Sequence, residues 1–320
     1  MTSFYPASSL DLGQPVGRIV DVDGRAVHVV EMGAGAPTVW LENGWLATCL
    51  GWQPFQEMLA AHTRVCAYDR AGIGFSDPAG SQRCAQNEAN EFADLLDALG
   101  ETAPIILLAW SGGGPVAQVF AADYPERVAG LILMDAIPPT YDLWASRTYP
   151  ERYPRERDAQ LEQVRAFAEG AAAGTLREDD IADWLTPEVR AVYGDRYTRQ
   201  LLRNPNFWWT YSSQYQSVIA SGAQVNAKGS LGDLPLTILI ADDFEMGAEP
   251  YHRQLGRMWR ELQVAQAQLS SRSRVIRAPA GHAIFREQPQ AVIDAVLDMI
   301  AAHADDIHRA PDAEPERISR

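Results

Sequence analysis

The chain is acidic and has enough apolar residues to bury a large core. It has 320 residues, of which 47% are hydrophobic, and its formal net charge is -15 at pH 7. The apolar content excludes disorder throughout the chain, and the negative charge excludes a nucleic-acid partner because phosphates would be repelled. The length fits one α/β domain that carries an insertion.

The sequence predicts neither a membrane span nor a disulfide framework. No apolar run reaches the roughly 20 residues that a membrane-crossing helix needs, and no basic amphipathic stretch suggests a membrane surface. The N-terminal residues lack the charged start and apolar block of a signal peptide. The three cysteines, Cys49, Cys66 and Cys84, are too few and too scattered for disulfides or a zinc site. We therefore expect a cytoplasmic protein without a metal.

The chain begins with a predicted β-hairpin. Residues 18–31 read as two strands around a turn at Asp23-Gly24. Six near-continuous apolar runs follow, a pattern typical of strands that are buried on both faces of a parallel sheet. These runs cover residues 37–41, 64–68, 104–110, 128–135, 236–242 and 274–279.

Helices are predicted between these strands. In residues 92–99, apolar side chains recur at i, i+3, i+4 and i+7, and Gly100 ends the pattern. Residues 255–262 and 292–300 carry similar stripes. Strand, helix and strand in repetition indicate βαβ units with right-handed crossovers. The expected fold class is α/β, with a mostly parallel eight-stranded sheet and helices on both of its faces.

One interval is too long for a simple crossover. About a hundred residues separate the sixth predicted strand from the seventh, and many of them are Trp or Tyr. We interpret this stretch as a helical cap, inserted after the sixth strand over the carboxyl edge of the sheet. The charged, proline-containing C-terminus is expected to be a disordered tail. The core would comprise residues 1–136 and 236–304, the cap residues 137–235 and the tail residues 305–320.

A single serine stands where a predicted strand turns into a predicted helix. Small residues, Ala109 and Gly113, lie two positions on either side of Ser111, as a tight strand-to-helix turn requires. The N-terminus of the following helix favours negative charge that develops near the hydroxyl. His282 suits the general base better than the other five histidines, because it follows the last strand on the same edge of the sheet. These positions predict a nucleophilic Ser111 that is activated by His282.

These segments resemble the α/β-hydrolase superfamily over residues 17 to 302. The stretch "AWSGGG" resembles the nucleophile elbow of that family, and "GHAIFREQP" resembles the segment that carries its catalytic histidine. "YDRAGIGFSDP" resembles the segment after its fourth strand. The resemblance implies the α/β-hydrolase fold and a serine hydrolase with an inserted cap.

The stretch "WLENGW" occupies the place of the oxyanion-hole turn. The family usually has His-Gly there, whereas this chain has Asn43-Gly44 and resembles a subgroup with Glu-x-Gly. The elbow likewise has Ala109 in place of the usual first glycine. Neither change removes the mechanism, because the donors are backbone N–H groups. By this resemblance the donors belong to Trp45 and Gly112.

Two places could supply the acid that orients the imidazole. The family usually carries this acid after the seventh strand, but Phe244 stands at the expected position and Asp242 and Asp243 precede it. Some members carry the acid at the end of the sixth strand, where this chain has Asp135. We prefer Asp135, because the spacing after the seventh strand is wrong for Asp243, which is the alternative.

The predicted reaction is hydrolysis of an ester, lactone or related acyl bond through an acyl-enzyme intermediate. The aromatic cap suggests an apolar or aromatic substrate. Candidate pocket residues are Asn43, Trp110, Trp144 and Trp208. Hydrolysis of a carbon–carbon bond, proline-iminopeptidase-like aminopeptidase activity and cofactor-free haloperoxidase activity stay open. A small-molecule receptor or a non-hydrolytic catalyst on the same fold is the alternative of another class.

No cofactor is expected. The stretch "AGIGFSD" contains Gly-x-Gly but lacks the third glycine and the strand-helix context of a dinucleotide fingerprint. The expected partner is a small-molecule substrate. The oligomeric state stays open, with a homodimer among the options.

Overall fold

An eight-stranded sheet forms the centre of the molecule. The computed structural model describes residues 16–186, 189–190 and 193–309, and the strand order of its sheet is β1-β2-β4-β3-β5-β6-β7-β8. The first two pairings, β1 with β2 and β2 with β4, are antiparallel, and the remaining pairings are parallel. The predicted hairpin and the mostly parallel sheet are therefore confirmed. The strands are β1 (Arg18–Val22), β2 (Arg25–Met32), β3 (Val39–Glu42), β4 (Val65–Tyr68), β5 (Ile105–Trp110), β6 (Val128–Met134), β7 (Leu236–Ala241) and β8 (Ser273–Ala278).

The continuous apolar runs reflect burial on both faces of the sheet. In β5, Ile106 and Leu108 belong to one apolar cluster, whereas Ile105 and Leu107 belong to another. Successive side chains of a strand point to opposite faces, so each face of β5 meets its own layer of helices. This explains why the central strands lack the polar alternation of a half-exposed sheet.

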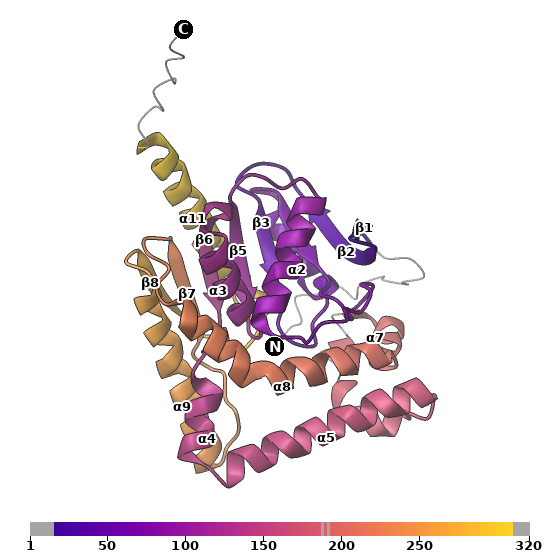
Figure 1. Ribbon diagram of the computed structural model, residues 1–320. Helices are drawn as coiled ribbons and strands as arrows, with labels where there is room; N and C mark the ends of the chain where they lie inside the picture. The colour runs from indigo at the N-terminus through magenta and orange to yellow at the C-terminus, as the bar shows by residue number, and fades with distance from the viewer. Residues whose placement is uncertain (1–15, 187–188, 191–192, 310–320) are drawn as a thin grey trace.

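Helices cover the two faces. The helices α2 (Ala85–Ala98) and α3 (Gly113–Asp123) pack on one face and lie in front of the sheet in Figure 1. The helices α1 (Gln53–Leu59), α10 (Ile284–Glu287) and α11 (Pro289–Arg309) pack on the other face. Because α11 continues through Arg309, residues 305–309 of the expected tail are helical, and residues 310–320 lie outside the described residues. Within the described residues, no helix is both long and apolar enough to cross a bilayer.

A layer of helices joins β6 to β7. Its described elements include α4 (Tyr141–Thr148), α5 (Arg152–Ala173), the 3-10 helix η3 (Glu178–Trp184), α7 (Asp195–Leu202) and α8 (Pro205–Lys228). Figure 1 shows α5 and α8 running below the sheet, while α9 (Pro250–Ala265) lies beside α4. We call residues 137–235 the cap. Its Phe167 and Trp208 share an apolar cluster with the sheet, and its division from the core as a separate domain stays a prediction.

Candidate active site

Ser111 occupies a tight turn between β5 and α3. Its φ is 53°, a left-handed conformation that is unusual for a residue with a side chain. Close packing explains the small neighbours, because a Cβ atom on Gly113 would lie 2.5 Å from the Asn43 carbonyl oxygen. The backbone carbonyl of Ser111 accepts hydrogen bonds from the N–H groups of Gly114 and Ile137. The turn thus presents the hydroxyl at the carboxyl edge of the parallel sheet.

Three side chains from different strand ends are hydrogen-bonded in series. Nε2 of His282 lies 2.8 Å from Ser111 Oγ. On the other side of the same imidazole, Nδ1–H donates to Asp135 Oδ2 at 2.5 Å. Asp135 follows β6 directly, is fully buried and has a φ of 40°. Its backbone N–H donates to the Leu239 carbonyl of β7. The arrangement can pass a proton from the serine to the imidazole, with a carboxylate beside the charged ring.

The alternative acid, Asp243, lies on an exposed loop. Its backbone N–H donates to the Ala280 carbonyl, and the neighbouring Asp242 pairs with Arg277. Phe244 occupies the family's usual acid position and stacks on the imidazole of His282, with ring centroids 4.7 Å apart. The seventh strand therefore supplies a ring contact to His282, and the sixth strand supplies its carboxylate partner.

Two residues of α9 support Asp135, and sequence reasoning missed both of them. The Gln263 side-chain amide donates to Asp135 Oδ1 at 2.7 Å, and the Trp259 indole N–H donates to the same oxygen at 3.2 Å. Both side chains are buried. Trp259 belongs to the predicted apolar stripe of this helix, and Gln263 lies one turn further on. A polar residue that continues an apolar stripe was the available signal.

The four candidate pocket residues lie in different surroundings. The indole N–H of Trp110 donates to the His282 carbonyl, so Trp110 lies beside His282. Trp144 packs against Tyr141 and Tyr149 in the cap. Asn43 and Trp208 are fully buried. The expectation that these two residues line a pocket is therefore corrected. The Asn43 side-chain amide is hydrogen-bonded to Tyr68 and Trp52, and the Trp208 indole N–H donates to the Leu202 carbonyl.

The turn after β3 packs against the serine. A Cβ atom on Gly44 would lie 3.1 Å from Ser111 Cβ, and one on Gly112 would lie 2.4 Å from Trp45 Cδ1. Among the hydrogen bonds of the described residues, none joins the amide of Trp45 or Gly112 to a protein acceptor. The indole of Trp45 also contacts Tyr211 and Tyr215 of α8, with ring centroids 6.2 Å and 6.1 Å away. Trp45 therefore joins the serine turn to the cap.

A buried charge cluster underlies this turn. The Arg70 guanidinium donates to Glu42 Oε1 at 2.8 Å and to the Gly44 carbonyl at 2.7 Å. The Tyr68 hydroxyl donates to Glu42 Oε2. Burial raises the pKa of Glu42 to about 7, although Arg70 and Tyr68 favour its charged form. Sequence reasoning missed Arg70, since nothing in "YDRAG" shows that its side chain is buried.

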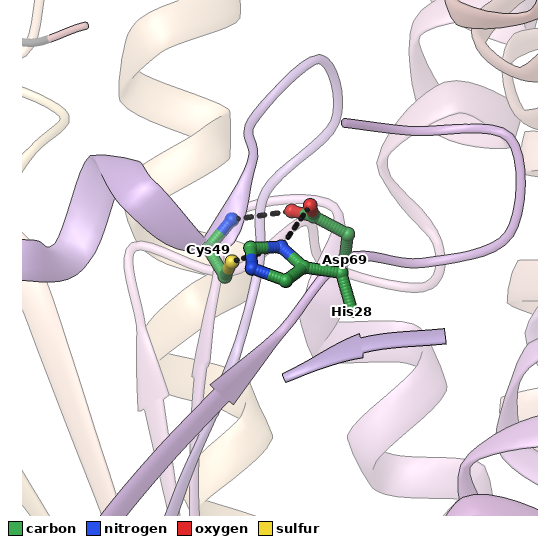
Figure 2. Close-up of side chains that lie close together, drawn as sticks. All are labelled: His28, Cys49 and Asp69. Carbon is green, nitrogen blue, oxygen red and sulfur yellow. Dashed lines mark hydrogen bonds and ion pairs between the residues drawn. The ribbon is translucent and has the colours of Figure 1, made fainter. Parts of the chain in front are cut away.

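A second cluster, His28, Cys49 and Asp69, has the residue types of a metal site (Figure 2). His28 Nδ1 lies 2.7 Å from Asp69 Oδ2 and its Nε2 lies 2.6 Å from the Val16 carbonyl. Two tetrahedral zinc ligands would be about 3.3 Å apart, so 2.7 Å is a hydrogen bond. Both ring nitrogens face acceptors, and burial raises the pKa of the Cys49 thiol well above its ordinary value. These groups fit a protonated imidazole between two acceptors, and the His28–Asp69 spacing does not fit a tetrahedral zinc ion.

The sequence matches a known family and several enzymes. The model of the alpha/beta hydrolase fold family matches residues 37–233, more than half of the chain. A 2-hydroxy-6-oxo-2,4-heptadienoate hydrolase of Pseudomonas putida is 31% identical over 131 residues, 40% of this chain and 47% of that protein. A non-heme chloroperoxidase of Streptomyces lividans is 31% identical over 144 residues, 44% of this chain and 51% of that protein. The chain thus matches about half the length of these curated relatives.

Solved structures share the fold over nearly the whole chain. A thermophilic esterase from Thermogutta terrifontis has a TM-score of 0.60 and 22% identity, and the match covers 89% of this chain and 98% of that one. An enol-lactonase from Burkholderia xenovorans has a TM-score of 0.58 and 19% identity, with 89% and 100% covered. At these identities the likeness concerns the fold alone. Together with the family match, it leads to the conclusion that the chain belongs to the α/β-hydrolase superfamily.

Proposed function

We propose that the chain is a serine hydrolase that cleaves an ester, lactone or related acyl bond of an apolar small molecule. The observation that carries this proposal is the series of hydrogen bonds from Ser111 through His282 to Asp135. A serine becomes a nucleophile when an adjacent base accepts its proton and a third group orients that base. The name of the hydrolase relative from Pseudomonas putida agrees with a hydrolytic reaction.

In the proposed first step, His282 Nε2 takes the proton of Ser111 as Oγ attacks the substrate carbonyl. The carboxylate of Asp135 holds Nδ1–H and stabilises the imidazolium that forms. The imidazolium then gives its proton to the leaving group, and an acyl-enzyme remains. Water then attacks the acyl carbon while His282 takes its proton. The bond from the acyl carbon to Oγ breaks, the imidazolium returns the proton to Ser111 Oγ, and the acid product leaves. Every step uses a group of this chain, so the proposal includes no cofactor.

The proposed oxyanion donors are the backbone N–H groups of Trp45 and Gly112. Two observations support this role: Gly44 packs against Ser111 and the Trp45 indole against Gly112, and neither amide has a protein acceptor among the described residues. A donor of this kind contributes about 3 kcal/mol to the stabilisation of a tetrahedral intermediate.

An apolar substrate is proposed because aromatic side chains surround the triad. Trp110 and Phe244 contact the imidazole, and Trp45 lies between the elbow and two tyrosines of α8. In this proposal the cap covers Ser111 and holds the apolar part of the substrate. The similarity to the heptadienoate hydrolase makes oxo-dienoates the second substrate class to assay.

A fluorophosphonate probe tests the proposal directly. We expect rapid labelling of the wild-type protein at Ser111 and no labelling of Ser111→Ala, because the probe reacts with an activated serine. Turnover of p-nitrophenyl esters and lactones should disappear in the same variant. A wild-type protein that resists the probe while it binds a small ligand tightly would instead support the receptor alternative.

A further inference from the structure

We propose that Arg70 is a positioning residue that orients the oxyanion-binding amide of Trp45, and that Glu42 holds Arg70 in place for this task. The proposal rests on the proposed function. It concerns two buried side chains that touch neither Ser111 nor His282 by hydrogen bonds. The proposal gives a physical reason for Glu42 in the stretch "ENGW".

The link from Arg70 to the oxyanion donor is one peptide group. Arg70 Nη2 donates to the Gly44 carbonyl oxygen at 2.7 Å. That carbonyl and the Trp45 N–H belong to the same planar amide and point in opposite directions. A charged donor that fixes the carbonyl therefore also fixes the direction of the N–H. It polarises the amide as well, which strengthens the N–H as a donor.

The Glu42 carboxylate holds the guanidinium on its other side. Arg70 Nη1 donates to Glu42 Oε1 at 2.8 Å, and the side chains are 3% and 1% exposed, so water does not compete for this pair. Glu42 also lies under the elbow, because a Cβ atom on Gly113 would be 2.8 Å from Glu42 Cγ. The ion pair thus stabilises the turn from Glu42 to Trp45 in its position beside Ser111.

The task requires the forked shape of arginine. One guanidinium nitrogen meets the carboxylate and the other meets the carbonyl, in a fixed plane. A lysine has a single nitrogen on a flexible stem and does not reproduce this geometry. Arg70→Lys therefore keeps the buried charge but loosens the amide of Trp45.

The matched control is Arg83, in the same charge cluster. Its side chain is 4% exposed and pairs with Glu88 at 3.2 Å and Glu91 at 2.6 Å. Glu88 also lies 4.0 Å from Arg70. Among the described residues, none of the ion pairs and hydrogen bonds of Arg83 involves Gly44. Arg83→Lys therefore disturbs the cluster in the same chemical way without reaching the serine turn.

The experiment compares the two variants on a p-nitrophenyl ester and on a trifluoromethyl ketone, which forms a tetrahedral adduct with an active serine. Loss of one oxyanion donor lowers kcat about 100- to 1000-fold, so a loosened donor should cost about 10- to 100-fold. For Arg70→Lys we expect that loss in kcat, a KM within about threefold of wild type, and a matching loss of ketone affinity. Arg83→Lys should stay near wild type in all three.

Equal losses of kcat in both variants, or a higher KM with unchanged kcat in Arg70→Lys, would overturn the proposal. If Arg70→Lys does not fold, Glu42→Gln decides, because glutamine keeps the size and an acceptor for Tyr68. A fall in kcat that matches the fall in ketone affinity supports the proposal, and unchanged kcat overturns it. A wild-type protein that the fluorophosphonate does not label refutes the proposed function, which separates that failure from a failure of the Arg70 proposal.

Discussion

Two histidine–aspartate pairs of this molecule, His282–Asp135 and His28–Asp69, differ in what faces the far ring nitrogen. In both pairs Nδ1 lies within 2.7 Å of a buried carboxylate oxygen. Nε2 of His282 faces the Ser111 hydroxyl, whereas Nε2 of His28 faces the Val16 carbonyl, which can only accept. The His282 side chain is 29% exposed and that of His28 is 0% exposed.

Because of this difference, His282 can act as a base, whereas His28 is a cation with a structural role. A hydroxyl can give its proton to a neutral ring, so His282 can act as a base. A ring between two acceptors keeps both of its protons. Burial lowers the pKa of His28, but the Asp69 carboxylate and the Val16 carbonyl outweigh it and raise the pKa above its ordinary value. The same two residue types thus serve different purposes, because their neighbours differ.

Removal of each imidazole tests the difference between His282 and His28 with the largest expected effect. His282→Gln should lower kcat on an active ester by about 10⁵-fold or more while the protein still folds, since the serine loses its base. His28→Gln should leave kcat per folded molecule near wild type but lower the melting temperature. Steady-state kinetics and thermal unfolding check both. Large losses of kcat in both variants at equal folded content would contradict the distinction.

Removal of a carboxylate is expected to cause the second-largest loss of kcat. Asp135→Asn should lower kcat by about 10⁴-fold, because an amide neither stabilises the imidazolium nor selects the required tautomer. Its control is Asp243→Asn on the exposed loop, which should stay near wild type. The reverse result, a near-normal Asp135→Asn and an inactive Asp243→Asn, would move the acid to the seventh strand.

The pH dependence of stability gives the smallest and most specific effect. A raised pKa in the folded state means that His28 stabilises fully below its unfolded value of 6.5 and that this contribution is lost as pH rises through the folded pKa. His28→Gln should therefore cost most at pH 6, about 3 kcal/mol for a broken buried pair, and less at pH 9. Urea unfolding at both pH values measures this. A cost that grows with pH would show that His28 is neutral in the folded protein.

Sequence patterns predicted most of the fold, because a strand that is buried on both faces of the sheet has a continuous run of apolar residues. A strand such as β5 must be apolar at every position, and its run is therefore visible without coordinates. The end of α11 was harder to place, since the charged residues of its last turns lie in a solvent-exposed helix and look like an irregular tail. The cap aromatics were also difficult, because a Trp in a helical core and a Trp in a pocket have the same local pattern. Trp208 was such a case.

The sequence by itself determined the local parts of this protein: its strands, the strand-to-helix turn at Ser111, and the late position of His282. Only the tertiary structure decided which carboxylate meets the imidazole, that Gln263 and Trp259 hold it, and that Arg70 reaches the carbonyl of Gly44. The physical reason is range. Strand burial and turn shape depend on neighbouring residues, whereas these hydrogen bonds join residues 26 to 147 positions apart and depend on how the strands, the turns and α9 pack.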